Sequence, residues 1–101
     1  MSMNIKAITT CMGYQQITSL SSATGLTVPT QTPDGSKQQP TFALIIAETQ
    51  GVRWRDDGTA PTASVGMVLP VLVTLSYDGD LNRIRFIQQA ASATLNVSYY
   101  A

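Results

Sequence analysis

Hydrophobic and polar residues alternate along much of the chain, and this pattern predicts strands rather than helices. In the segment "VRWR", Val52 and Trp54 alternate with Arg53 and Arg55. Successive side chains of a strand point to opposite faces, so the two arginines are expected to face outward. Val52 and Trp54 are then expected to face the core.

The same alternation recurs in "RIRFIQ" at 83–88 and in the C-terminal "ATLNVSYYA". A weaker version at 4–10 predicts an N-terminal strand, and the continuously apolar 42–48, "FALIIAE", predicts a central buried strand. The residues expected to anchor the core are Val52, Trp54, Ile84, Phe86, Leu95 and Val97.

Turn signals separate these segments about every 8–12 residues, a spacing typical of β-sandwiches and barrels. The clearest loop is 29–41, "PTQTPDGSKQQPT", with three prolines and a Pro-Asp-Gly turn. The length of 101 residues suits one domain, 1–101. We therefore predict an all-β fold: an antiparallel β-sandwich of seven or eight short strands, with a jelly roll as one form.

The segment 65–75, "VGMVLPVLVTL", is more apolar than one strand face requires. Alternation hides half of such side chains, and the proline confines the segment to an edge, a bulge or a loop. The rest would be exposed unless another chain covers them. We therefore predict that this segment contributes to a subunit contact. The charged turn beside Trp54 is a second candidate for such a contact. The candidate residues of both regions are Leu69, Pro70, Val71, Leu72, Ile87, Arg53, Arg55, Asp56 and Asp57.

Charge adds little to this picture at the level of sequence. Six basic and six acidic residues cancel, and no basic stripe is visible along the chain, so neither nucleic acid nor membrane is expected as a partner. The chain shows no secretory signal and no apolar run of about 18 residues. We expect synthesis in soluble form in a cytosol.

The sequence offers few residues suited to catalysis or metal binding. Asp56 and Asp57 are adjacent, so a strand would point them apart, and the neighbouring arginines would keep them ionised rather than ready to donate a proton. Calcium ligands at Asp56–Asp57 or at Asp78 and Asp80 lack the EF-hand spacing. Histidine is absent and Cys11, the single cysteine, is expected to be partly buried. We predict no enzyme, metal or cofactor.

Aromatic residues leave one alternative open. Trp54 or Tyr100, if exposed, would offer flat apolar faces of the kind that bind sugars, and the chain would then be a carbohydrate-binding or host-attachment module. Burial of Trp54 in the core is the competing interpretation.

Four segments together resemble small virion proteins of tailed bacteriophages: "ITSLSSATGLTVP", "VRWRDDGTAPTASVGM", "LSYDGDLNRIRFIQ" and "ATLNVSYYA". They cover most of the chain beyond residue 16. The resemblance implies a non-enzymatic capsid decoration or cement protein on the virion surface, bound to the major capsid protein as a homo-oligomer, a trimer or a dimer. A tail, neck or fibre component is the alternative within this class.

The sequence departs from this resemblance after "GM" at 66–67. Similar proteins tend to place a small polar turn with glycine there, whereas this chain continues "VLPVLVTL". The departure puts the local turn geometry in question and favours a hydrophobic contact at the same place.

Overall fold

Eight β-strands in two antiparallel sheets make up the regular structure of the computed structural model, which describes residues 9–101. Sheet A contains, in spatial order, β1 (Cys11–Ile17), β8 (Thr94–Tyr100), β3 (Phe42–Glu48) and β6 (Thr74–Tyr77). Sheet B contains β2 (Thr24–Gly25), β7 (Arg85–Gln88), β4 (Val52–Arg55) and β5 (Met67–Leu69). No helix occurs between residues 9 and 101, so the predicted all-β fold is confirmed.

The strands pair in a nested order. Strand β1 pairs with β8, β2 with β7, β3 with β6, and β4 with β5. Two further pairs, β3 with β8 and β4 with β7, complete the sheets. Consecutive strands lie in different sheets except for β4 and β5, and the chain crosses between the sheets at 18–23, 26–41, 49–51, 70–73, 78–84 and 89–93.

The core lies between the inner faces of the two sheets. Of the predicted anchors, five are completely buried and one, Trp54, is half-buried and packs against the edge of the core. The five buried anchors are Val52, Ile84, Phe86, Leu95 and Val97. Strand β3 alternates between buried and half-buried positions, because it is an interior strand of sheet A with one face toward the core.

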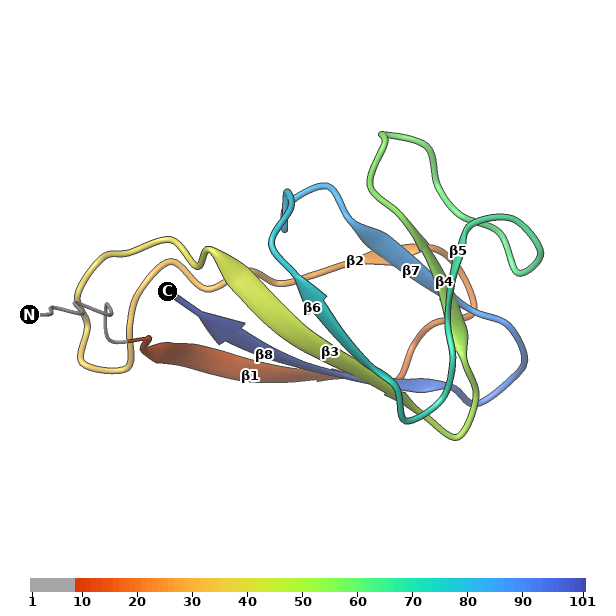
Figure 1. The fold of residues 1–101 in the computed structure, drawn as a ribbon, viewed down its shortest axis with the longest axis horizontal. Helices are drawn as coiled ribbons and strands as arrows, with labels where there is room; N and C mark the ends of the chain where they lie inside the picture. The colour runs from red at the N-terminus through yellow and green to blue at the C-terminus, as the bar shows by residue number, and fades with distance from the viewer. Residues whose placement is uncertain (1–8) are drawn as a thin grey trace, which may run out of the picture.

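Figure 1 shows the long strands of sheet A running along the long axis of the molecule, with sheet B set against one end. The predicted 29–41 loop lies at the other end, near the C-terminus (Figure 1). Its Pro-Asp-Gly turn is closed by the Thr32 amide, which donates to the Ser36 carbonyl at 2.8 Å. Gly35 supplies the left-handed φ of 92° that this turn needs.

Two predictions concern the N-terminal part of the chain, the strand at 4–10 and the partial burial of Cys11. The strand predicted at 4–10 falls mostly outside the described residues, and the first observed strand begins at Cys11. Cys11 is exposed, not partly buried. The register shifts between Cys11 and Gly13, and this bulge turns Met12 into the core instead. Across the described part of the chain, no helix is long and apolar enough to cross a membrane.

Candidate assembly surface

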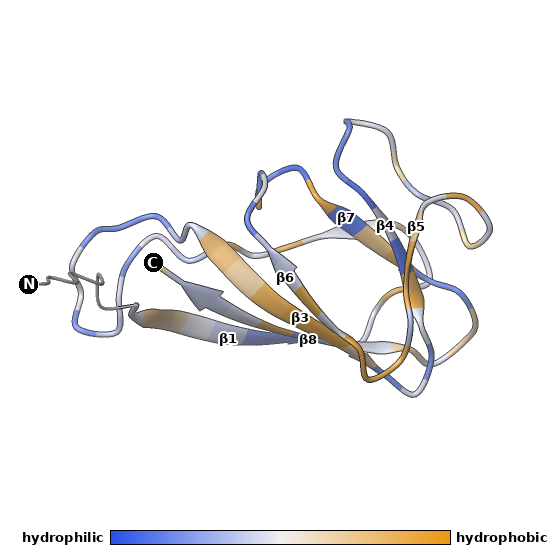
Figure 2. Ribbon diagram, viewed as in Figure 1, coloured by the Kyte–Doolittle hydropathy of each residue, from blue (hydrophilic) through white to orange (hydrophobic). Residues whose placement is uncertain are grey.

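Exposed hydrophobic side chains gather in one place, at the edge of the sandwich where β5 and β6 lie. The structure describes seven large hydrophobic residues as exposed, and six of them fall within residues 65–73. We name this group the apolar edge: Val65, Met67, Val68, Val71, Leu72 and Val73. The β5–β6 connection appears as an orange stretch at the bottom of Figure 2.

Leu72 is the most exposed member, at 73%, and its backbone is strained. Its φ of 65° lies in the left-handed region, which costs an ordinary L-residue about 1–2 kcal/mol. Two backbone contacts hold this conformation. The Leu72 amide donates to the Ala47 carbonyl of β3 at 2.8 Å, and Val71 forms an isolated parallel β-bridge with Ala47. The fold therefore fixes the backbone that points a leucine into solvent.

The predicted contact segment is more exposed than strand alternation alone requires. Within 67–73 only Leu69 is buried, where it packs opposite Val52 of β4. Pro70 follows directly after β5, an edge strand, so its missing N–H interrupts no ladder. Residues 70–73 then form a turn rather than a strand, which explains why so few of their side chains reach the core.

The outer face of sheet B carries arginines in cross-strand register. Arg53 and Arg55 of β4 face outward as predicted, because Val52 beside them is buried. Arg55 lies directly opposite Arg85 of β7, and Arg83 reaches the turn at Gly58. Four of the six basic residues thus share one region. Strands β4 and β7 both carry blue stretches in Figure 2. The order of residues along the chain did not reveal this grouping, because strand pairing joins segments 28 or more residues apart.

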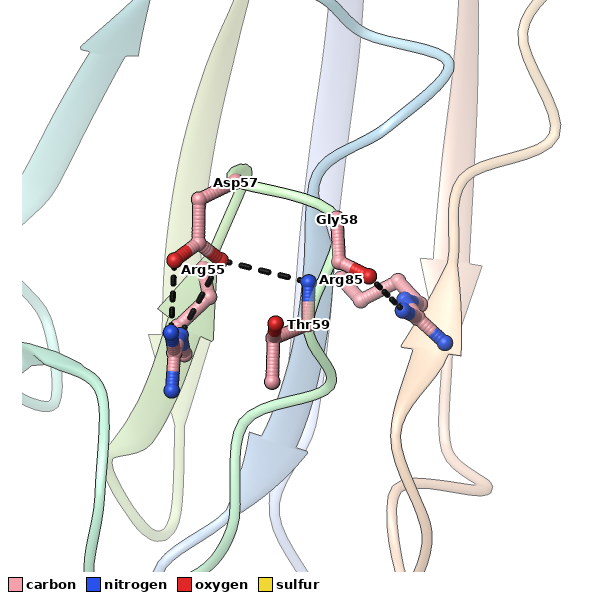
Figure 3. A network of polar contacts seen from close by, with 5 residues as sticks. All are labelled: Arg55, Asp57, Gly58, Thr59 and Arg85. Carbon is pink, nitrogen blue, oxygen red and sulfur yellow. Dashed lines mark hydrogen bonds and ion pairs between the residues drawn. The ribbon is translucent and has the colours of Figure 1, made fainter.

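The charged turn after β4 is held by local bonds (Figure 3). Arg55 forms a two-pronged ion pair with Asp57, at 3.1 Å and 2.5 Å, and Asp57 also accepts from the Thr59 amide at 3.3 Å. The hydrogen bond from Arg55, with that from Thr59, lowers the pKa of the Asp57 carboxyl to about 2. Gly58 turns the chain with a φ of 91°.

Asp56 points elsewhere and joins the two sheets. It accepts a hydrogen bond of 2.5 Å from the hydroxyl of Tyr77 on β6, whose ring packs edge-on against Trp54 at 5.8 Å. Burial of the phenol and the adjacent Asp56 raise the pKa of Tyr77 above its ordinary value. The adjacent carboxylates therefore serve different partners, although they lie in the turn after β4 and not in a strand as the prediction assumed. No group of three or more potential metal ligands occurs among residues 9–101.

Trp54 lines a shallow cleft of about 250 Å³. The cleft lies between β4 and the start of β5, and Met67 forms part of its apolar wall. Its polar rim is the same charged turn. Trp54 is thus neither fully in the core nor an open platform. Tyr100 is half-buried and stacks on Phe42 at 5.1 Å.

Two further predicted contact residues, Ile87 and Arg53, are cross-strand neighbours in sheet B. Ile87 lies opposite Arg53 on the outer face of sheet B, with Val68 on the other side of Arg53. Arg53 donates to the carbonyls of Ala63 and Gly66, at 3.1 Å and 2.9 Å, and so ties the 56–66 loop to β4. The alternation in "RIRFIQ" predicts that Arg83 and Arg85 face outward, but they were not among the predicted contact residues. Their "RxR" spacing, shared with Arg53 and Arg55, was the available signal.

Comparison with known proteins finds no matching family model, no similar curated protein and no similar solved structure.

Proposed function

We propose that this chain is a non-enzymatic structural protein of a bacteriophage particle, a decoration or cement protein that binds the major capsid protein. In this proposal the apolar edge forms the contact, between copies of the chain or with the capsid lattice. Repeated equivalent sites on a particle would let modest individual contacts add up to firm attachment.

The observation that carries this proposal is the exposure of Leu72 in a left-handed backbone conformation. An exposed leucine in a left-handed conformation weakens the isolated fold twice, through backbone strain and through apolar surface in water. Glycine or asparagine would take the same backbone without that strain. A second chain covering Leu72 supplies the reason for a leucine at this position.

The strand order supports the finer assignment of the fold. Nested pairing of the first strand with the last, and so on inward to β4 with β5, is the connectivity that we propose to describe as a jelly roll. Eight-stranded, double-sheet jelly rolls are common in viral capsid domains and in lectins. The architecture is therefore compatible with a virion role, which is argued from the apolar edge.

The test compares two substitutions that relieve the same kind of strain. Leu72→Asn removes the exposed side chain, while Thr49→Asn changes another exposed left-handed residue, at φ 71°, outside the apolar edge. We expect wild-type and Thr49→Asn proteins to self-associate and to co-sediment with purified phage heads. Leu72→Asn should lose both properties and still fold.

Light scattering over a concentration series gives the mass of each protein in solution, and thermal unfolding verifies its fold. Assembly and head binding unchanged in Leu72→Asn would overturn the role of the apolar edge. Failure of the wild-type protein to bind heads, combined with binding to purified tails, would move the proposal to a tail, neck or fibre component.

The cleft at Trp54 favours a second candidate, a carbohydrate-binding or host-attachment module. An indole wall beside the carboxylates of Asp56 and Asp57 is a combination that binds sugar faces and hydroxyls. Titration with oligosaccharides of the host surface, followed by tryptophan fluorescence, tests this candidate. Because Trp54 is the single tryptophan, an unchanged spectrum with every sugar would exclude binding at this cleft.

A further inference from the structure

We propose that the outer face of sheet B is a second binding surface, which takes a carboxylate-rich surface of a partner protein. The surface consists of Arg55, Arg83 and Arg85, with Ile87 and with Val68, which it shares with the apolar edge, and we name it the arginine face. This inference goes beyond the assembly role of the apolar edge and does not depend on the partner being a phage head.

Strand register sets the side chains of this face in two rows. One row crosses from β5 to β7 as Val68, Arg53 and Ile87. The next runs from β4 to β2 as Arg55, Arg85 and Gly25. Directly opposite residues lie on the same face, so two guanidinium-bearing side chains are neighbours in the second row.

Like charges opposite each other destabilise a sheet, so the pair of Arg55 and Arg85 needs compensation. Arg55 obtains it from Asp57. Arg85 donates only to the Gly58 carbonyl, at a long 3.4 Å, and the described residues provide no carboxylate within 4.0 Å of Arg83 or Arg85. The fold thus brings these charges together and leaves two of them without a counterion.

The side chains of Arg83 and Arg85 both reach Gly58. A Cβ atom at this position would lie 2.8 Å from a terminal nitrogen of Arg83, and the Gly58 carbonyl is the acceptor of Arg85. Arg83 is exposed and Arg85 half-buried, so both remain accessible at the edge of this turn. Two planar guanidinium groups at one place suit two-pronged bonding to carboxylates.

The composition of the face favours protein carboxylates over a nucleic-acid backbone. A phosphate track usually needs more cations, spread along the path of the strand, and a chain of zero net charge provides little long-range attraction. The arginine face is instead small and mixed, since Val68 and Ile87 are apolar neighbours of the arginines. Arginine combined with apolar side chains is typical of protein–protein contacts.

The test titrates the full chain with a hexaglutamate peptide, and with a hexaglutamine peptide as the uncharged control, by isothermal calorimetry at low ionic strength. The variant Arg83→Gln/Arg85→Gln is compared with the wild type. Lys37→Gln is the matched control, because it also removes an exposed positive charge but lies in the 29–41 loop.

We expect the double variant to bind hexaglutamate roughly tenfold more weakly, because charge-assisted bonds are lost. Lys37→Gln should bind like wild type, and hexaglutamine should not bind. Equal losses in Lys37→Gln and the double variant, or no binding by the wild type, would overturn the proposal. Tighter binding of a short DNA duplex than of hexaglutamate, lost in the double variant, would overturn it in favour of nucleic acid.

The outcome is separable from that for the apolar edge. Leu72→Asn keeps every arginine and should bind hexaglutamate like wild type. Loss of peptide binding in Leu72→Asn would contradict a separate arginine face, whatever that variant does with phage heads.

Discussion

The two sheets share one core but differ on their outer faces. On sheet A, Asn96 of β8 joins three strands: its amide oxygen accepts from Tyr14 and Gln16 of β1, and its amide nitrogen donates to Glu48 of β3. On sheet B, Arg55 lies opposite Arg85, and the exposed Met67 and Val68 of β5 contribute to the apolar edge. The polar side chains around Asn96 on sheet A bond to one another, whereas on sheet B Arg83 and Arg85 have no carboxylate within 4.0 Å among the described residues.

Strand length follows the same division. Three of the four strands of sheet A have seven residues, while no strand of sheet B has more than four. Long ladders with internal polar bonds hold sheet A together without outside help. The strands of sheet B are short, and Asp57 lies in the turn after β4 while the strained Leu72 lies in the connection after β5. We infer that sheet A serves as the scaffold and sheet B carries the binding surfaces.

The largest expected effect tests the shared core. Phe86 on β7 is fully buried, so Phe86→Ala should lower the free energy of unfolding by about 3–5 kcal/mol. Val68→Ala, on the outer face of the same sheet, should change it by less than about 0.5 kcal/mol. Urea denaturation measures both. Similar values for the two variants would mean that sheet B does not contribute its inner face to the core.

The next effect contrasts the two outer faces directly. Asn96→Ala removes hydrogen bonds to two neighbouring strands, and we expect a loss of about 1–2 kcal/mol in unfolding free energy. Arg85→Ala should stay within about 0.5 kcal/mol, because its single backbone bond is long and its charge is opposed by Arg55. Thermal unfolding in the same buffer compares them. A larger loss for Arg85→Ala would reverse the proposed division between scaffold and binding face.

A smaller effect concerns the bond that joins the sheets. Tyr77→Phe keeps the ring against Trp54 but removes the donor to Asp56, and should cost about 1 kcal/mol. Tyr14→Phe removes a hydroxyl bond within sheet A and provides the control. Chemical denaturation gives both values. If Tyr77→Phe were neutral, the contact between Tyr77 and Asp56 would not contribute to holding the two sheets together.

The smallest expected effect concerns the pKa of the Asp57 carboxyl in the charged turn. Asp57 should titrate near pH 2, below the ordinary 3.8, as followed by the NMR shift of its carboxyl carbon. Since the folded-state pKa is lowered, the stabilising contribution is present above pH 3.8 and disappears as the pH falls toward 2.

In Arg55→Gln the pKa of Asp57 should rise but stay below 3.8, because the Thr59 amide still donates. An unchanged pKa in this variant would show that the ion pair with Arg55 is absent in solution. Because both side chains are solvent-exposed, the effect on unfolding should be slight.

Local sequence patterns predict much of the β-sandwich. Alternation in "VRWR" and "RIRFIQ" correctly separated the buried residues from the arginines, because a strand has only two faces. The excess of apolar residues around Pro70 correctly marked an exposed segment for the same reason. Cys11 was placed wrongly, since a bulge of one residue reverses which side chain faces inward and leaves no clear mark in the sequence.

What the sequence by itself determined was therefore the class of fold, the anchors of the core and the apolar character of 65–75. Which strands become neighbours depends on long-range pairing, and only that pairing placed Arg55 opposite Arg85 and made an arginine face from two distant segments. Only the tertiary structure decided the conformation of Leu72 as well. Its left-handed backbone is held by the hydrogen bond to Ala47 of β3, a contact that no local preference of leucine would predict.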